Sequence, residues 1–287
     1  MATLGTVSEI RRYPVKSMGG EVLDATPLGP RGLPGDRAWA VRDEVRGGIR
    51  GAKKIPALMR LSAVYPSAPP AEGSAPAVIT LPDGSTCTTT DPDVNERLSR
   101  ALDHRVSLWP LVPPENREHY VRGAPTHEDF EQEMRATFAR LPDEPLPDLM
   151  VFPPELFELE SPLGTYFDAF PLLLLTTSSL RTMAARHAES RFDVRRFRPN
   201  FLIDTAEADG FPEMEWAGRR LRIGDAVLQA TVVCPRCVMT THGFADLPKD
   251  PGIMRSLVKE TGGILGLYAS VESAGTVRRG DRIALVD

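Results

Sequence analysis

The sequence contains only three cysteines in 287 residues: Cys87, Cys234 and Cys237. A small and odd number of cysteines argues against a disulfide-stapled secreted protein. It also excludes a four-cysteine zinc ribbon or iron–sulfur cluster made only from the thiols of this chain, because such a site needs a fourth cysteine.

Long apolar runs are also missing. No segment approaches the ~20 apolar residues that span a bilayer, and residues 1–12 lack the apolar core of a signal peptide. No Gly-x-Gly-x-x-Gly turn marks a dinucleotide site. The net charge of −5 gives no general attraction to nucleic acid or anionic lipid. We therefore expect a cytoplasmic protein with no membrane span, no nucleic-acid partner and no nicotinamide site of its own.

Proline, in contrast, is abundant, with 27 residues. This is close to twice the ~5% of average proteins, so long helices must be few. Short apolar runs separated by Gly and Pro predict a β-meander in the first ~45 residues. Residues 77–81 and 85–89 are predicted to form a hairpin, followed by a short helix with Asp91 as its N-cap and by a strand at 105–111.

The second half of the chain shows the same mixture of strands and few helices. Residues 112–170 are acidic and rich in proline, and they predict a linker merging into an elaborated loop with one helix at 127–141. The apolar run at 172–175 predicts a buried strand, and the following hydroxyl residues predict the cap of a helix. Residues 220–233 and 265–286 resemble hairpins. The fold class is therefore mainly β with a few helices (α+β), in two domains.

Two segments are candidate anion donors. The unpaired amides at the start of the helix near Thr177 form either an anion site or an ordinary cap. Five arginines follow within thirteen residues, a pattern that is usually a solvated face. Arg198 differs because it is held between Phe197 and Pro199 and precedes an apolar strand. A rigid, forked donor in that position suits phosphate.

The most informative motif is Cys-Pro-Arg-Cys at residues 234–237, at the end of an apolar run. Such a pair can be a redox dithiol, half of a zinc site with His242 nearby, a thiolate for one soft metal, or two small buried residues. A plain redox dithiol is disfavoured, because Cys237 is followed by Val238 and threonines rather than by an amphipathic helix.

Five short motifs occur in an order that is typical of one family. They are Tyr-Pro-Val-Lys-Ser at 13–17, Gly-Leu-Pro-Gly-Asp-Arg at 32–37, Phe-Arg-Pro-Asn at 197–200, the cysteine pair with Thr240-Thr241, and the segments 266–271 and 275–281. With them the chain resembles the MOSC-domain proteins, in particular the branch of the mitochondrial amidoxime-reducing component and its bacterial relatives. The resemblance implies an N-terminal MOSC-type β-barrel module at 1–112 and a MOSC β-barrel domain at 113–287, with 113–170 as its proline-rich linker and elaborated loop.

The same resemblance implies a molybdenum cofactor, a pterin-dithiolene molybdenum group, seated between the two modules. Cys237, in preference to Cys234, matches the catalytic thiolate that ligates the metal, in agreement with the affinity of thiolates for soft metals. The residues implied to bind the cofactor and its phosphate are Lys16, Ser17, Arg37, Thr177, Ser178, Ser179, Arg198, Asn200 and Arg236.

The implied activity is the reduction of N-hydroxylated compounds, with electrons from a separate carrier protein and its reductase, because no ferredoxin module follows the last hairpin. The alternative is a sulfur carrier or cofactor-handling protein with a persulfide on Cys237. His242 and Asp168 are candidates for proton relay. His242-Gly243-Phe244 replaces the Val-Asp-Pro-like stretch common in the family, so the resemblance does not carry substrate preference.

Overall fold

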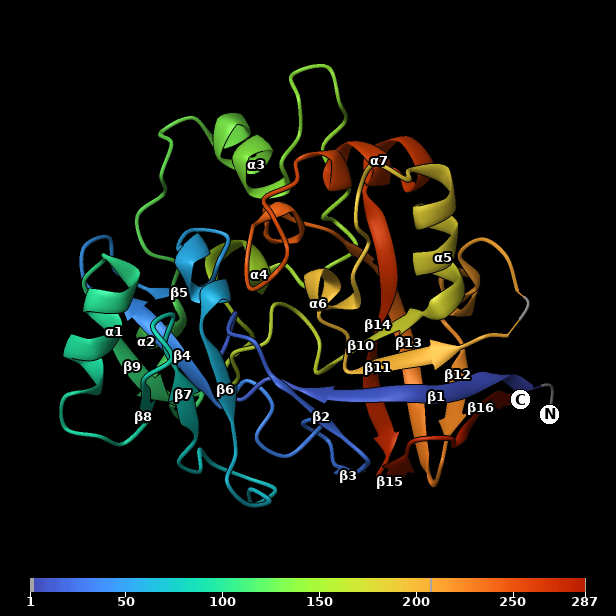
Figure 1. Cartoon of the computed structure of the whole chain (residues 1–287), viewed down its shortest axis with the longest axis horizontal. Coiled ribbons are helices and arrows are strands. Elements are labelled where there is room, and N and C mark those ends of the chain that lie inside the picture. Colours follow the sequence, from blue (N-terminus) through green and yellow to red (C-terminus); the bar gives the residue numbers. More distant parts are fainter. Residues whose placement is uncertain (1–2, 207, 287) are drawn as a thin grey trace.

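The computed structural model describes residues 3–206 and 208–286, and a closed β-barrel forms the larger of its two modules (Figure 1). Seven strands follow one another in the order β11, β10, β14, β13, β12, β16 and β1, and β1 pairs back with β11. Their bounds are β1 Thr3–Arg12, β10 Leu172–Thr176, β11 Phe201–Asp204, β12 Arg220–Ile223, β13 Ala226–Pro235, β14 Ile264–Ser273 and β16 Arg282–Val286.

The barrel interior is filled by residues that recur with the two-residue period of a strand. Leu172 and Leu174 on β10, and Leu267 and Ala269 on β14, belong to one buried apolar cluster. Short helices cover the outside of the barrel (Figure 1). They are α5 Thr177–Arg186, α6 Val194–Phe197 and α7 Gly252–Thr261, with the 3-10 turns η2 Pro212–Trp216 and η3 Val238–Thr241.

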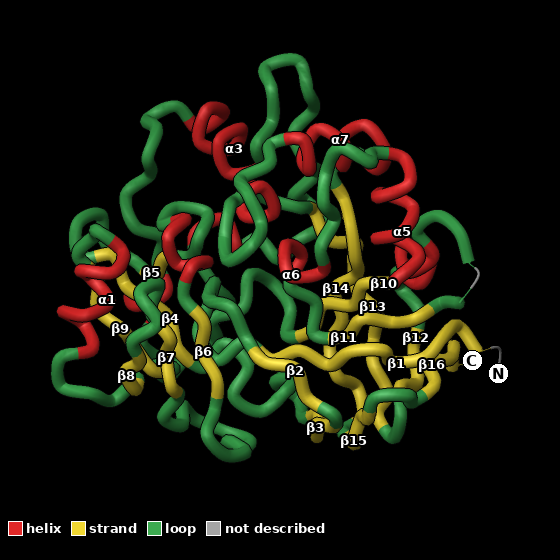
Figure 2. The backbone as a smooth tube through the Cα atoms, viewed as in Figure 1, coloured by secondary structure: helices red, strands yellow, loops and turns green. Residues whose placement is uncertain are grey.

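The N-terminal module has its own core between two small sheets, at the left of Figure 2. One sheet pairs β5, β4 and β9, and the other pairs β6, β7 and β8. The bounds are β4 Trp39–Asp43, β5 Ile49–Arg50, β6 Ser62–Val64, β7 Val78–Thr80, β8 Thr86–Thr88 and β9 Val106–Pro110, with η1 Pro56–Arg60 and α1 Val94–Leu102. The expected hairpin is confirmed as the β7–β8 pair.

The predicted N-terminal meander is wrong. β1 pairs with β2 (Glu21–Leu23), but β3 (Ala25–Leu28) pairs with β15 (Gly275–Arg278). β4 pairs with β5 and β9 rather than with its predecessor. The physical reason is burial: Val7 and Ile10 of β1 belong to the core of the large barrel, so this strand is committed there.

Asp91 is not the helix cap that the sequence suggested. Its carboxylate accepts the backbone N–H of Thr88 at 2.8 Å and so closes a turn, while Asp93 precedes the helix. A short acidic side chain serves a turn or a cap equally well, so the sequence does not separate the two.

The proline-rich segment crosses from one module to the other and carries α2 Arg117–Tyr120, α3 Phe130–Phe138 and α4 Glu155–Glu158 (Figure 1). The predicted helix at 127–141 is confirmed as the shorter α3. An ion pair between Lys54 and Glu133 ties α3 to the N-terminal module. Arg140 donates to the Gly262 carbonyl at 2.9 Å, at the end of α7. Among the residues described, no helix is long and apolar enough to cross a bilayer.

Candidate functional site

Cys237 lies where the two modules meet. β13 ends at Pro235, and Cys237 immediately precedes η3. Its half-buried side chain packs against the core of the N-terminal module, although it belongs to the barrel domain. Burial raises the pKa of the Cys237 thiol, whereas the charge on Lys53 lowers this pKa and that on Asp168 raises it further.

Cys234 has a different environment from Cys237. It is 2% exposed, and Arg236 donates from Nη1 to its sulfur at 3.0 Å. Arg236 also donates to the carbonyl of Phe197, so its guanidinium is fixed beside the loop that precedes β11. Within residues 3–206 and 208–286, no three His, Cys, Asp or Glu side chains gather as a metal-binding group, so the chain brings no zinc-type ligand set to this pair.

The sequence predicts that Arg198 binds an anion, and its buried guanidinium has a free donor for one. It is 8% exposed, and Nη1 donates to the Met18 carbonyl at 2.5 Å. Its Nη2 is buried without a hydrogen-bond partner. A buried charged donor without a partner is costly, so this atom indicates a place for an acceptor. Burial lowers the pKa of Arg198 to about 10.

Tyr13 brings two arginines together. The guanidinium carbon of Arg198 lies 4.1 Å from the centre of the Tyr13 ring, and that of Arg37 lies 5.1 Å away. Asp36 fixes this group, because its carboxylate accepts from the Tyr13 backbone N–H at 2.7 Å, from Asn200 at 3.0 Å and from Arg37. Asn200, in the barrel domain, thus holds Asp36 of the N-terminal module in place.

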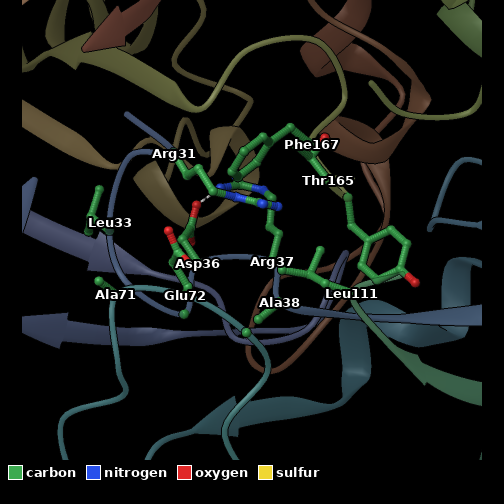
Figure 3. Close-up of a pocket in the computed structure, with 13 residues that line it drawn as sticks. Arg31, Leu33, Asp36, Arg37, Ala38, Ala71, Glu72, Leu111, Thr165 and Phe167 are labelled. Atoms are coloured by element: carbon green, nitrogen blue, oxygen red, sulfur yellow. Dashed lines mark hydrogen bonds and ion pairs between the residues drawn. The ribbon is translucent and has the colours of Figure 1, made fainter. Parts of the chain in front are cut away.

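Arg37 also lines a small pocket in Figure 3, where it lies beside Asp36 and shares the wall with Thr165 and Phe167. The pocket adjoins the site through this arginine and through the segment just before Asp168. Cys237 is not among the residues that line it.

Three predicted ligands have a left-handed backbone: Ser17 at φ 69°, Arg37 at φ 50° and Arg198 at φ 57°. Residues other than glycine rarely adopt this region, and such strain gathers at functional sites. Ser17 accepts the backbone N–H of Ala52 at 2.9 Å and thereby joins two loops of the N-terminal module.

Lys16 occupies the site but has no free donor. The residue is 3% exposed, and its ammonium donates to Asp168 at 2.9 Å, to the Tyr166 carbonyl at 2.9 Å and to Ser161 at 3.3 Å. Because an ammonium has three donors, all of them are used within the protein. Burial lowers the pKa of Lys16, and Asp168 partly offsets this effect.

The hydroxyl cluster lies away from the arginines. Thr176 accepts the Ser179 backbone N–H at 3.1 Å, which confirms the predicted cap, but Ser179 donates to the buried carboxylate of Glu213 at 2.7 Å. β10 and β11 are parallel, and the Asn200 backbone N–H donates to the carbonyl of Leu173. Thr177 begins α5 four residues after Leu173, so it lies about 13 Å from Asn200 along the strand direction. The structure therefore does not bring Thr177, Ser178 and Ser179 together with Arg198.

Sequence reasoning missed Lys53 and the role of Asp36. Lys53 lies 3.5 Å from Asp168, the candidate for proton relay. Burial would raise the pKa of Asp168, but Lys16 and Lys53 outweigh it and hold this pKa well below its usual range. No local motif marks Lys53. Asp36 belongs to the Gly-Asp-Arg motif, but only its buried contacts show that it fixes Arg37.

Family comparison matches both modules. The MOSC N-terminal beta barrel domain matches residues 4–102, and the MOSC domain matches residues 164–284. The chain is similar to mitochondrial amidoxime reducing component 2 of Rattus norvegicus, with 26% identity over 98% of this chain and 83% of that protein. Mitochondrial amidoxime-reducing component 1 of Homo sapiens is also 26% identical, over 99% and 83%.

A shorter match has slightly higher identity. It is to mitochondrial amidoxime reducing component 2 of Macaca fascicularis, with 30% identity over 41% of this chain and only 38% of that protein. Among solved structures, the YUAD protein from Bacillus subtilis has a TM-score of 0.43 and 11% identity over 97% of this chain and 93% of that one. YiiM from Geobacillus stearothermophilus has a TM-score of 0.31 and 18% identity over 41% and 55%. With both domains matched in order, the chain is a MOSC-domain protein that carries a MOSC N-terminal β-barrel domain and resembles the mitochondrial amidoxime-reducing components.

Proposed function

We propose that this protein is a molybdenum-cofactor-dependent oxidoreductase that reduces N-hydroxylated compounds with electrons from a separate carrier protein. The observation that carries the proposal is the partly accessible thiol of Cys237, which lies at a junction lined by cationic side chains. One of these, Arg198, has a buried donor without a partner. The names of the relatives, amidoxime reducing components, support the substrate class. The cytoplasmic location stays a prediction.

The residues fit an anionic cofactor that has a soft metal. Arg198 Nη2 is the clearest phosphate donor, and Arg37 has further N–H groups beyond the one that Asp36 accepts. Ser17 immediately precedes Met18, whose carbonyl accepts a hydrogen bond from Arg198. Arg236 contacts Cys234 and immediately precedes Cys237 in the chain. Cys237 supplies the thiolate that a soft metal prefers. Bound there, the cofactor supplies the two-electron chemistry that removes the oxygen, and the protein supplies orientation and charge.

The two candidates for proton relay, His242 and Asp168, differ in burial and in the causes of their pKa shifts. His242 is 8% exposed, its Nε2 lies 3.0 Å from the Ala52 carbonyl, and burial lowers its pKa, so a neutral structural role fits it best. Asp168 has a side chain that is 42% exposed and stays ionised. It therefore accepts hydrogen bonds from a ligand and is connected to solvent, but a carboxylate whose pKa is held so low is a weak proton acceptor.

Metal and pterin analysis of the purified protein and two matched variants tests the proposal. We expect near-equal amounts of molybdenum, pterin and protein, and turnover of an amidoxime with a chemical reductant or a carrier, but none with reduced nicotinamide alone. Cys237→Ser should abolish turnover because an alkoxide is a poorer ligand for a soft metal, whereas Cys234→Ser should retain it.

Metal-free wild-type protein with labile sulfur would contradict the oxidoreductase and support the persulfide carrier. A dead Cys234→Ser variant beside an active Cys237→Ser variant would reverse the assignment of the metal ligand. Thermal unfolding of both variants serves as the control for the fold.

A further inference from the structure

Arg196 on α6 is a buried cation that contacts backbone rather than solvent. It is 1% exposed, although the run of five arginines to which it belongs is usually a solvated face. In the described part of the chain, all of its hydrogen bonds go to backbone carbonyls. Nε donates to Arg191 at 3.1 Å, Nη1 to Thr240 at 3.2 Å and to His242 at 3.0 Å, and Nη2 to Pro248 at 2.8 Å. Burying a guanidinium against carbonyls alone is costly, so this arrangement indicates a role beyond packing.

Three of these four carbonyls lie in the loop that follows Cys237. The loop begins with η3 and reaches into the N-terminal module, where Met239 and Phe244 pack against the core of that module. The backbone N–H of Asp250 donates to Thr241 at 2.8 Å and closes the loop. Arg196 holds the loop from the barrel side, because one planar guanidinium donates to residues at both ends of it.

Thr240 connects Arg196 to Cys237. The Thr240 backbone N–H donates to the Cys237 carbonyl at 3.2 Å, and the Thr240 hydroxyl donates to the same carbonyl at 3.0 Å. The carbonyl of Thr240 in turn accepts from Arg196. Thr240 is itself only 1% exposed, so water does not compete for these contacts. A single residue therefore lies between the buried guanidinium and the backbone of the cysteine.

The neighbouring arginines contact the same loop only at an exposed position. Arg191 and Arg195 each pair with Asp246 at 2.8 Å, and all three side chains are at least 34% exposed. Exposed ion pairs of this kind contribute little, because water and salt compete for them. These two arginines form the solvated face that the sequence pattern predicts, whereas Arg196 does not.

We propose, resting on the proposed function, that Arg196 is a positioning residue for the metal ligand. It holds the carbonyl of Thr240, Thr240 holds the carbonyl of Cys237, and the thiol is thereby kept at one place in the junction between the modules. A lysine has the same charge but donates from a single nitrogen, so it cannot reproduce a fork whose three nitrogens donate in different directions. Arg196 therefore supplies position rather than charge.

Two variants and one control test this connection. Arg196→Lys keeps the charge and removes the fork, and Thr240→Val removes the hydroxyl that donates to Cys237 while keeping the shape of the side chain. Arg195→Met is the control, because Arg195 precedes Arg196 on α6 and pairs with the exposed Asp246. The first measurement is amide hydrogen exchange, followed peptide by peptide, on full-length protein made without molybdenum. It requires neither metal nor substrate.

We expect residues 238–250 to exchange about tenfold faster in Arg196→Lys, because the lost hydrogen bonds make local opening easier, and β14 to exchange at the wild-type rate. Thr240→Val should act in the same direction. In the molybdenum-loaded protein, Arg196→Lys should lower kcat about tenfold and change KM less than about twofold, since the substrate keeps its own contacts. Arg195→Met should match wild type in both measurements.

The double variant shows whether Arg196 and Thr240 act along one path. Arg196→Lys with Thr240→Val should lose no more kcat than Arg196→Lys alone, because both changes break the same chain of contacts. A loss equal to the product of the two single losses would mean that the residues act independently, and the proposed connection would be wrong.

Hydrogen exchange can overturn the positioning role in two ways. Unchanged exchange in Arg196→Lys would mean that a lysine holds the loop equally well. Faster exchange in every peptide would mean that Arg196 only stabilises the fold. The proposed function fails separately: if exchange and its restriction to residues 238–250 are as expected but loaded wild-type protein does not reduce an amidoxime, the positioning of the loop stands and the oxidoreductase does not.

Discussion

At the scale of single residues, the site depends on buried charges that the protein itself does not fully satisfy. Arg198 lies on Tyr13 and donates one N–H to a backbone carbonyl, yet its second terminal nitrogen has no partner. Desolvating a guanidinium and leaving a donor unpaired is unfavourable for folding. A bound anion removes that cost, so folding and ligand binding are coupled at this side chain.

Arg198→Ala should therefore lower the metal and pterin content of protein prepared under limiting cofactor. The lost charge-assisted contact is worth roughly 1.5–3 kcal/mol, or about ten- to a hundredfold in affinity. Arg191→Ala is the matched control, because Arg191 lies in the same segment but forms an exposed pair with Asp246. Equal cofactor content in the two variants would show that Arg198 is only structural.

At the scale of elements, local sequence patterns predicted the secondary structure of a segment better than its position in the tertiary fold. The β7–β8 hairpin, the cap of α5 and the rigid Arg198 were predictable because turn residues, hydroxyls and a following proline act over a few positions. The placement of that cap was not predictable, since it depends on the parallel register of β10 and β11. Lys53 and Asp168 were not predictable as a pair, because 115 residues separate them and only the tertiary fold joins them.

The cap of α5 carries a prediction of its own. Glu213 on η2 is fully buried and accepts hydrogen bonds from Thr176 and Ser179, and burial raises its pKa. A carboxyl whose folded pKa exceeds its unfolded value binds its proton more tightly in the folded state. Its stabilising contribution is therefore present below the unfolded pKa, near 4.5, and is lost as pH rises through the folded pKa.

Glu213→Gln should consequently become more favourable, relative to wild type, as pH rises. Urea unfolding of both proteins at about pH 5 and about pH 8 measures the change in the difference of their unfolding free energies. Glu215→Gln, on the same turn but exposed, should show no such trend. A difference that is constant with pH would mean that Glu213 does not titrate within the folded protein over this range.

At the scale of the whole molecule, the two modules are not separable by cutting the chain between them. β1 lies within the segment that matches the MOSC N-terminal beta barrel domain, yet it pairs with both β11 and β16 and closes the barrel of the other module. The site has the same mixed origin, with Lys16, Ser17, Arg37 and Lys53 from one side and Asp168, Arg198 and Cys237 from the other. Because the first strand of the chain belongs to the barrel of the second module, folding of that barrel also fixes the position of the N-terminal residues of the site.

A fragment of residues 113–286 should therefore fail to unfold cooperatively. It lacks Val7 and Ile10 from the barrel core, and it leaves β11 and β16 as unpaired edges. Thr3 pairs with Ala284, so β1 begins beside the end of β16 (Figure 1), and a short linker from residue 286 to residues 3–12 would return the strand as a hairpin. That permuted fragment should regain a single thermal transition by circular dichroism, because the closed barrel has no edge. If the fragment without residues 3–12 melts as cooperatively and at the same temperature, β1 is not what holds the barrel closed.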